Sequence, residues 1–453
     1  MRHDLFGSPV ALSSAGAARD WNATCLAFLA HGTETPVHLG KVLDAEPNFA
    51  LGHALRGMFC MLLGRREMAE TARDALSAAH AALSMGTVDR RNREMTAALE
   101  AMLARDPRRA VAALERILRG DPGDTLAMKL SHAVRFLVGD AAGMRRSVER
   151  VLPAHGGDHP GLGYAMGCHA FALEETGAYA EAEAAGMAGL GHAPKDAWGL
   201  HAVAHVHDMT ARSSDGIALI DGHRAAWEGA NNFRYHVWWH KALLHLDRGE
   251  TGEALALYDT KIRAEKTDDY RDIANATSLL MRLELEGQRV GDRWEELAAL
   301  SEGRVEDGSL VFADLHYLLA LIGGDRAVAQ EQLLTRLALQ SRQSDAMASI
   351  CSDPGLSAAS GLAAFGAGRY TLALAHLESA RPRLSSIGGS HAQRDVFERI
   401  TIDAALRAGR PERAEAILRE RRARRGGCED AFAASRMSRI MRMRQSVRSA
   451  AAR

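Results

Sequence analysis

The sequence predicts an all-α protein. Aromatic residues make up only 5% of the 453 residues while alanine and leucine are abundant, and this composition favours packed helices over sheets. No stretch alternates apolar and polar residues, with β-branched side chains, over the length that a sheet requires. The chain is also too long for one compact core of ordinary design, so we expect several domains or one elongated array of repeats.

A recurring glycine and alanine pattern favours the array. Glycine suits the C-terminal end of a helix, and a small alanine early in the next helix allows the two helices to pack closely. A glycine followed five residues later by an alanine, between two apolar helical stretches, occurs at 64–69, 177–182, 249–254, 368–373 and 409–414. Each of these sites therefore predicts a helix, a tight turn and a second helix.

Proline gives a second mark of the repeat. We expect Pro47, Pro122, Pro160 and Pro194 to lie in the first turns of helices, where the missing N–H costs nothing. The last three lie 38 and 34 residues apart, and a period near this length with two helices per unit is typical of tetratricopeptide repeats. The sequence thus predicts an α-α superhelix, a TPR-like α-solenoid of degenerate helix-turn-helix repeats.

We expect this single solenoid to span residues 1–430, with a polar groove centred on about 195–400. Residues 431–453 are predicted to form a basic C-terminal helix or tail, in which five arginines recur: Arg436, Arg439, Arg442, Arg444 and Arg448. We favour a terminal capping helix with a solvated basic side. The alternative is a tail that grips an acidic partner or nucleic acid.

Composition excludes several classes of function. Lysine plus arginine number 56 and aspartate plus glutamate 57, which argues against a general role on nucleic acid or on a membrane surface. No secretory signal begins the sequence, and no apolar window reaches the length of a membrane span. The five cysteines are scattered and odd in number, so we expect reduced thiols in a cytoplasmic protein.

Two histidine pairs mark the candidate site. His201 and His205 are one helical turn apart and face the same way, on a helix expected over 196–209. His236 and His240 follow each of them by 35 residues, so the two pairs occupy equivalent positions in adjacent repeats. We therefore expect the four rings to lie side by side on the inner face of the array.

Such a patch permits several chemistries. Imidazole can act as an acid or base near neutral pH, or bind a ligand, and these uses are the ones we favour. A divalent metal held by the two pairs is a less favoured alternative. A purely structural alternative is that the histidines form hydrogen bonds between adjacent repeats. Of the two adjacent tryptophans only one can fully line a pocket, since neighbours on a helix differ by about 100°, and we assign this role to Trp239.

Two further stretches carry candidate residues. Asp314 and His316 stand at an expected helix start, where Asp314 either caps the helix or joins the pocket. In the second stretch Ser390 and Gln393 have the spacing of a capping box. The helix that they would begin carries His391, Arg394 and Asp395 as candidate ligand-binding residues, and the first turn of a helix with an arginine is a natural anion site.

In combination these stretches resemble the tetratricopeptide repeat protein 38 family. The matching pieces include HAVAHVHDM, HVWWHKALLHLDRGE, SLLMRLELEGQRVGDRW, FADLHYLLA and GGSHAQRDVF, in unchanged order, with DLFGSPV and PNFALGHALRGM nearer the N-terminus. The resemblance covers nearly the whole chain and implies an α-solenoid, but it gives little on activity. It implies these polar positions: His201, His205, His236, His240, Arg282, Asp314, His316, Gln393, Arg394 and Asp395.

The chain departs from the family at Asn275, where an acidic residue commonly precedes the SLL stretch. If that carboxylate completes a metal or acid–base site, Asn275 weakens it, and Asp272 one turn earlier is the expected substitute.

Three functions follow as expectations. The favoured one is a cytoplasmic repeat protein that binds a small polar molecule or a peptide in a groove lined by histidine, tryptophan and aspartate. The second is a small-molecule hydrolase or lyase whose catalytic residues are His201, His205, His236, His240, Asp314 and His316. The third is a protein–protein scaffold, the commonest role of such repeats. Repeat arrays often pair through exposed terminal faces, so a homodimer is one expected assembly.

Overall fold

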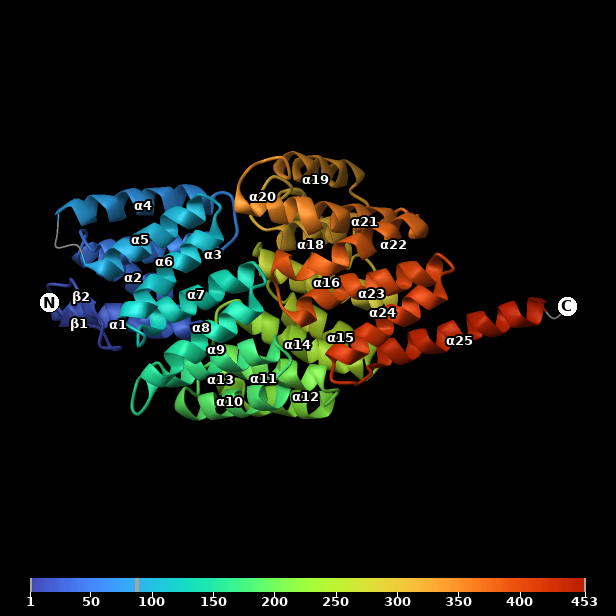
Figure 1. The fold of residues 1–453 in the computed structure, drawn as a ribbon, viewed down its shortest axis with the longest axis horizontal. Coiled ribbons are helices and arrows are strands. Elements are labelled where there is room, and N and C mark those ends of the chain that lie inside the picture. The colour runs from blue at the N-terminus through green and yellow to red at the C-terminus, as the bar shows by residue number, and fades with distance from the viewer. Residues whose placement is uncertain (1, 86–88, 452–453) are drawn as a thin grey trace. The chain divides into compact units, whose positions relative to one another are not determined.

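The structure is a computed structural model that describes residues 2–85 and 89–451, without the side chains of residues 447, 448, 450 and 451. The described chain is almost entirely helical, which confirms the predicted all-α class (Figure 1). Within it, strand structure is confined to a short antiparallel pair, β1 (Arg2–His3) with β2 (Pro9–Val10), and an isolated bridge between Gly32 and Ala230.

The chain divides into two compact units. The first comprises residues 1–203, 223–234 and 345–347, and the second comprises 204–222, 235–344 and 348–453. The division passes through helices α11, α14 and α20, each of which contributes residues to both units. The predicted extent of a single solenoid, 1–430 with a tail at 431–453, stays a prediction, and residues 452–453 of that tail lie outside the described residues.

The first unit is built from consecutive helix pairs. Its helices are α1 (Ala15–Leu29), α2 (Thr35–Ala45), α3 (Ala50–Leu62), α4 (Met68–Met85), α5 (Arg90–Leu103), α6 (Pro107–Gly120), α7 (Thr125–Leu137), α8 (Ala141–Val151), the 3-10 helix η1 (Leu152–His155), α9 (Leu162–Glu174), α10 (Tyr179–His192), the start of α11 (Ala197–Met209) and α13 (Arg224–Trp227). Neighbours such as α3 with α4 and α9 with α10 pack along their lengths. The core between them is apolar, with Trp21 edge-on to Phe49 at 5.0 Å.

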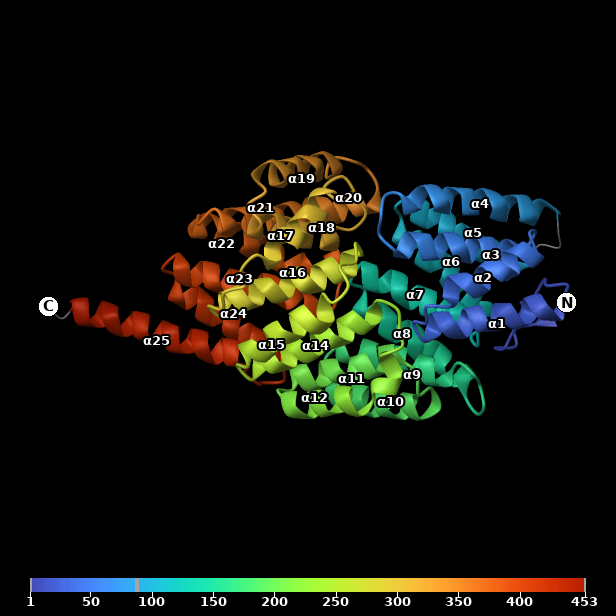
Figure 2. The same cartoon turned by 180° about the vertical axis from the view of Figure 1, so that it is seen from behind.

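The second unit repeats this pairing (Figure 2). Its elements are α12 (Ser213–Gly222), α14 (Phe233–Asp247), α15 (Thr251–Leu257), the π-helix η2 (Tyr258–Ile262), α16 (Tyr270–Leu285), α17 (Arg293–Glu302), α18 (Val311–Gly323), α19 (Ala327–Gln340), α20 (Ala346–Ile350), the π-type turn η3 (Cys351–Gly355), α21 (Leu356–Gly366), α22 (Tyr370–Ala380), the 3-10 helix η4 (Arg381–Ile387), α23 (His391–Arg407), α24 (Pro411–Arg424) and α25 (Ala431–Ala451). Helix α16 packs on both α18 and α23, which brings its polar residues to the middle of the unit.

The repeat glycines behave as the pattern predicts. All five adopt the left-handed conformation that terminates a helix, with φ between 63° and 83°: Gly64, Gly177, Gly249, Gly368 and Gly409. At Gly177, which ends the α9 turn, the chain can reverse direction within four residues and begin α10 at Tyr179. The predicted helix-turn-helix units are therefore confirmed at these sites.

The prolines lie slightly differently from the prediction. Pro47, Pro122, Pro160 and Pro194 fall in the turns just before α3, α7, α9 and α11, outside the first helical turn. The reason is visible at α7, where Asp124 is the cap and accepts a hydrogen bond from the Ala127 N–H, so the helix begins after the turn that Pro122 shapes. Proline does occupy the first turn of α6, at Pro107, and of α24, at Pro411.

The described part of the basic C-terminal helix is anchored in the second unit. The Arg436 guanidinium is buried and binds Asp403 and Glu286, and its Cζ lies 4.1 Å from the ring centre of Phe432. Arg439 and Arg442 are exposed, and the side chain of Arg448 lies outside the described residues. The helix thus has one buried and one solvated basic side.

Two smaller expectations can be compared with the structure. All five cysteines are free thiols, in agreement with their spacing in the sequence. None of the described helices is both long enough and apolar enough to cross a membrane.

Candidate functional site

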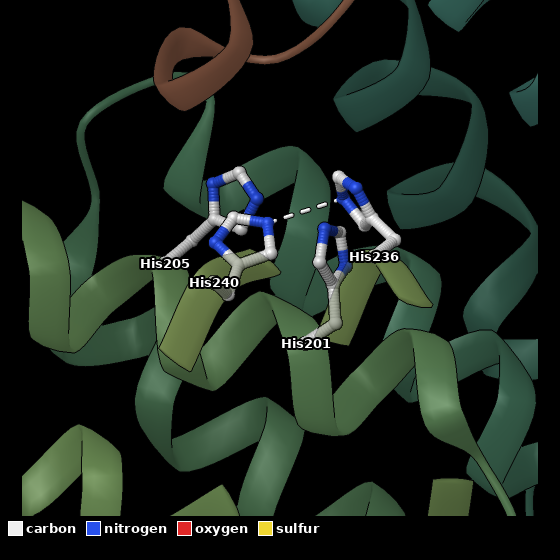
Figure 3. A group of neighbouring side chains, drawn as sticks. All are labelled: His201, His205, His236 and His240. Atoms are coloured by element: carbon white, nitrogen blue, oxygen red, sulfur yellow. Dashed lines mark hydrogen bonds between the residues drawn. The ribbon is translucent and has the colours of Figure 1, made fainter. Parts of the chain in front are cut away.

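Four buried histidines come together on helices α11 and α14 (Figure 3). His205, His236 and His240 belong to the second unit, and His201 stands one turn earlier on the continuous helix α11. One ring nitrogen of each lies within 4.8 Å of the corresponding nitrogens of the others. The rings of His205 and His240, 35 residues apart in sequence, have centres 4.3 Å apart. The 35-residue register therefore does place the pairs together; the catalytic roles assigned to them stay predictions.

Hydrogen bonds orient these rings. The Nε2 atoms of His236 and His240 lie 3.1 Å apart. On the far side of the His236 ring, Nδ1 donates to Oδ1 of Asn275 at 3.2 Å, because an amide oxygen can only accept. The Nδ1 of His201 faces the Trp198 carbonyl oxygen at 3.4 Å. Both contacts assign the proton to Nδ1, so the lone pair of each of these two rings is on Nε2.

Burial keeps His236 uncharged. Loss of water, helped by the neighbouring His205, lowers the pKa of His236 to about 3. At neutral pH this ring is therefore a lone-pair donor rather than a cation.

Trp239 forms one wall of the histidine cluster. Its indole stacks on His236 at 5.3 Å and meets His240 edge-on at 4.9 Å, and the Arg282 guanidinium lies 5.5 Å from its centre. Trp238 is buried as well but turns the other way, beneath Lys241 and Lys261. Only one of the adjacent indoles thus serves the polar region, as the angle between them predicts.

A separate cavity of about 520 Å³ lies in the second unit. It is bounded by the C-terminal ends of α11 and α14, by α16, by η4, and by α23 and α24. Among the described residues, charged side chains dominate its wall. The arginines are Arg282, Arg381, Arg394, Arg399, Arg413, Arg421, Arg424 and Arg425, and the acidic residues are Asp208, Asp247, Glu378, Asp395, Glu398 and Glu420.

Most of this charge is paired in one buried network. The Arg425 guanidinium binds Asp208 and Asp247, each at 2.8 Å. The Arg421 guanidinium binds Asp395 at 2.7 Å and also Asp430. Although burial alone would raise it, the Arg421 and Arg399 guanidinium groups hold the pKa of Asp395 well below its usual range. The Asp395 carboxylate is therefore ionised and holds the Arg421 and Arg399 guanidinium groups in place.

Arg282 differs from the paired arginines. It is 1% exposed, and its hydrogen bonds go to two backbone carbonyls, Ser278 at 3.2 Å and Ala392 at 2.6 Å. Its buried Nε has no hydrogen-bond partner, and no carboxylate within residues 2–85 and 89–451 forms an ion pair with it. Burial and the nearby Arg399 guanidinium lower the pKa of Arg282 to about 9. It is a buried cation on the cavity wall that the Asp395 and Asp208 carboxylates stabilise only from beyond ion-pair distance.

The candidate ligand-binding residues separate into two groups. Arg282, His391, Arg394 and Asp395 line the cavity. The remaining three lie elsewhere among the described residues: Trp239 and Asn275 contact the histidine cluster, and Asp272 accepts a hydrogen bond from the Thr267 hydroxyl. Asn275 thus stands beside His236 in the place where the family resemblance expects an acidic group, and Asp272 binds the loop before α16 instead.

Helix α23 carries one predicted contact and several that join it to neighbouring elements. Ser390 and Gln393 form the predicted capping box. Glu398 pairs with Arg381 and Arg424, while the Arg394 guanidinium donates to the carbonyls of Gly388 and Gly389. The i, i+4 spacing of Arg394 and Glu398 is therefore overridden by arginines from η4 and α24.

Asp314 is not a helix cap, because α18 begins at Val311 after the cap residue Leu310. Both of its oxygens bind the Arg336 guanidinium, at 3.0 and 2.5 Å. His316 is buried between Phe312 and Phe397, and its Nδ1 lies 2.7 Å from the Phe312 carbonyl oxygen. This geometry gives no support to an acid–base pair formed by Asp314 and His316.

Sequence reasoning missed most of the charged network. Asp208 follows His205 by three residues and Asp247 follows His240 by seven, so both continue the faces that carry the histidines. That helical periodicity could have identified both aspartates from the sequence. No sequence pattern could have identified Arg425, since it binds Asp208 across 217 positions of sequence.

Comparisons with known proteins add a fold-level likeness only. No family model matches the chain. One similar solved structure is the human IFIT1 dimer with m7Gppp-AAAA, at 13% identity and a TM-score of 0.43, covering 96% of each chain. Another is Naa15/Naa10 bound to HypK-THB, at 13% identity and a TM-score of 0.24, covering 90% of this chain and 63% of the other. At these scores the likeness carries no argument about function.

Proposed function

We propose that this helical-repeat protein binds a small anionic molecule, bearing a carboxylate or phosphate group, in the arginine-lined cavity of its second unit. The observation that carries the proposal is Arg282, a fully buried guanidinium on the cavity wall that donates to carbonyls and has a free Nε–H. A buried cation is costly unless a negative charge neutralises it. A bound anion would supply that charge.

The shape and surroundings of the cavity support a small ligand. A volume of about 520 Å³ is within the range of pockets that hold metabolite-sized molecules. The planar guanidinium donates two parallel N–H groups, which suits the paired oxygens of carboxylates and phosphates. The paired arginines around Arg282 are fixed by Asp395 and Asp430, so the wall is rigid before a ligand arrives.

The start of helix α23 contributes to the same wall. His391, Ala392 and Arg394, all in its first turn, line the cavity. The helix dipole favours a negative charge near such a terminus. This contribution adds to that of Arg282.

Two finer assignments belong to the proposal. Membership in the tetratricopeptide repeat protein 38 family is supported by the ordered motifs that carry the candidate residues. A cytoplasmic location is supported by five free cysteines in a chain of this length.

The test is thermal unfolding of the purified protein with inorganic phosphate, pyrophosphate, succinate and citrate, and with glucose as a neutral compound. We expect at least one anion to raise the Tm by several degrees, since a ligand that binds only the folded state stabilises it. Arg282→Met should abolish the rise. Arg289→Met, a change at an exposed arginine just after α16, should leave it intact.

An equal rise in wild type and Arg282→Met would contradict the proposal, because the effect would then arise elsewhere on the surface. A rise with glucose alone, or no rise with any of the four anions, would contradict it as well.

A further inference from the structure

We propose that His205, His236 and His240, together with His201, bind one divalent transition-metal ion, with Zn²⁺ as the ion that fits best. This site is distinct from the anion cavity, and the proposal does not depend on anion binding. It rests on the spacing of the ring nitrogens, on the groups that orient the rings and on the chemistry of the donors.

The spacing is close to that of a formed metal site. Nitrogen ligands of Zn²⁺ lie about 2.0–2.1 Å from the metal, so two ligands in a tetrahedron are about 3.3 Å apart. The Nε2 atoms of His236 and His240 are 3.1 Å apart, and the ligand atoms of all four histidines lie within 4.8 Å of one another. Small side-chain rotations are enough to bring the nitrogens around one ion.

Polar groups behind the rings hold them in the orientation that a metal requires. Metal-binding histidines commonly donate their second N–H to an oxygen, which fixes the tautomer and directs the other nitrogen to the ion. The Asn275 side-chain oxygen does this for His236, and the Trp198 carbonyl does so for His201. Trp239 closes one side of the cluster by stacking on His236.

A packing role explains this arrangement less well. Four imidazoles buried to 9% exposure or less bring polar nitrogens together in the interior, where apolar side chains would pack at a lower desolvation cost. With the His236 proton on Nδ1, its Nε2 can only accept, so His240 must supply a proton to make the 3.1 Å contact. One bound cation would instead receive a lone pair from each of the converging rings.

The donor set selects the class of ion. Neutral imidazole nitrogens suit Zn²⁺ and its neighbours among the transition metals, whereas Mg²⁺ and Ca²⁺ prefer oxygen ligands. Three histidines would leave one position of a tetrahedron open, and His201 is placed to fill it. Leu243, one turn beyond His240, lines the anion cavity, so the ion would lie close to that wall.

The test uses full-length protein without a histidine tag, stripped with a chelator and titrated with Zn²⁺ alone in a calorimeter. We expect wild type to bind one Zn²⁺ per chain. The double variant His236→Ala, His240→Ala should weaken binding at least 100-fold. The control is His316→Ala, which removes a buried histidine of the same unit outside the cluster and should bind Zn²⁺ as wild type does.

A second variant covers the case in which the double variant does not fold. Asn275→Leu keeps all four rings and removes the oxygen that orients His236; loss of such a partner typically costs about 10–100-fold in metal affinity. Tetrahedral Co²⁺ absorption, monitored in the same proteins, reports the ligand geometry directly. Folded wild type that takes up no Zn²⁺, or Asn275→Leu and the double variant binding as tightly as wild type, would overturn the proposal.

Discussion

The histidine cluster and the arginine cavity both take side chains from helices α11 and α14, but the first takes uncharged histidines and the second takes aspartates that form ion pairs. Helix α14 presents His236 and His240 in its first half and Asp247 at its end, and α11 presents His205 and then Asp208. The His236 ring is held by a neutral contact, in which its Nδ1 donates to the Asn275 side-chain oxygen. Asp208 and Asp247, in contrast, are held by the Arg425 charge.

The two regions show that one pair of helices can bury both uncharged and charged polar groups. A cluster of imidazole nitrogens suits a metal cation, whereas a buried guanidinium that forms no ion pair within residues 2–85 and 89–451 suits an anion. We therefore expect that removing a buried charge lowers the free energy of unfolding strongly when it leaves an ion-pair partner without its counter-charge. Removal should have little effect when the group has no such partner.

The largest expected effect comes from Asp430→Asn. Asp430 is 4% exposed and binds both Arg399 and Arg421, so its loss leaves two buried cations short of negative charge. We expect the free energy of unfolding, measured in urea, to fall by about 3–5 kcal/mol. The neighbouring change Glu429→Gln, at an exposed ion pair with Arg422, should cost less than about 1 kcal/mol. Equal effects of the two changes would break the comparison.

The same network predicts an acid limit to stability. The Arg421 and Arg399 guanidinium groups lower the pKa of both Asp395 and Asp430, against the effect of burial. A lowered folded-state pKa contributes stability that is complete above the unfolded value of about 4 and is lost as the pH falls below it. Unfolding free energy should therefore decline below about pH 4, and less steeply in Asp430→Asn. A decline of the same steepness in both proteins would assign it to other carboxylates.

A smaller effect is expected at the capping box that begins α23. The Ser390 hydroxyl accepts from the Gln393 N–H and thereby fixes the turn beside the cavity. Ser390→Ala should lower the free energy of unfolding by about 1 kcal/mol. Ser386→Ala, at a half-buried serine of η4 whose hydroxyl donates to the Arg383 carbonyl, is the control and should change it by less than about 0.5 kcal/mol. A loss of the same size at both serines would exclude the cap as its cause.

The smallest effect on stability is expected at Arg282, which makes this variant the sharpest contrast with Asp430. Arg282→Met removes a buried charge without stranding a carboxylate, so relief of desolvation offsets the two lost hydrogen bonds to carbonyls. Urea unfolding should give a free energy equal to that of wild type or up to about 1 kcal/mol higher. A loss above about 2 kcal/mol would mean that Arg282 is a structural element of the core.

Local sequence patterns predicted the helical-repeat fold and the grouping of the four histidines, but not the network of ion pairs. The repeat glycines, the capping box at Ser390 and the register of His201 with His236 each depend on spacing within one or two helices, and helical periodicity fixes such spacing. Charge pairing does not follow from spacing. Asp314 binds Arg336 from the next helix, and Arg425 binds Asp208 across 217 positions of sequence.

The long-range ion pairs could not be predicted from the sequence. Any arginine can pair with any carboxylate that lies close to it, and the sequence does not show which residues lie close together. Which of the many arginines stays without a carboxylate is decided only when α16, α23 and α24 are packed together. Arg282 was singled out in the sequence through its motif, but its unpaired state became apparent only in the structure.

Calorimetric titration of citrate and inorganic phosphate into wild type and Arg282→Met tests the central claim most directly. The account predicts that wild type binds at least one of these anions one to one. Arg282→Met should bind it at least 10-fold more weakly and take up Zn²⁺ unchanged. Equal anion affinity in the two proteins, or no binding of either anion by wild type, would contradict the assignment of Arg282 as the cation that an anion completes.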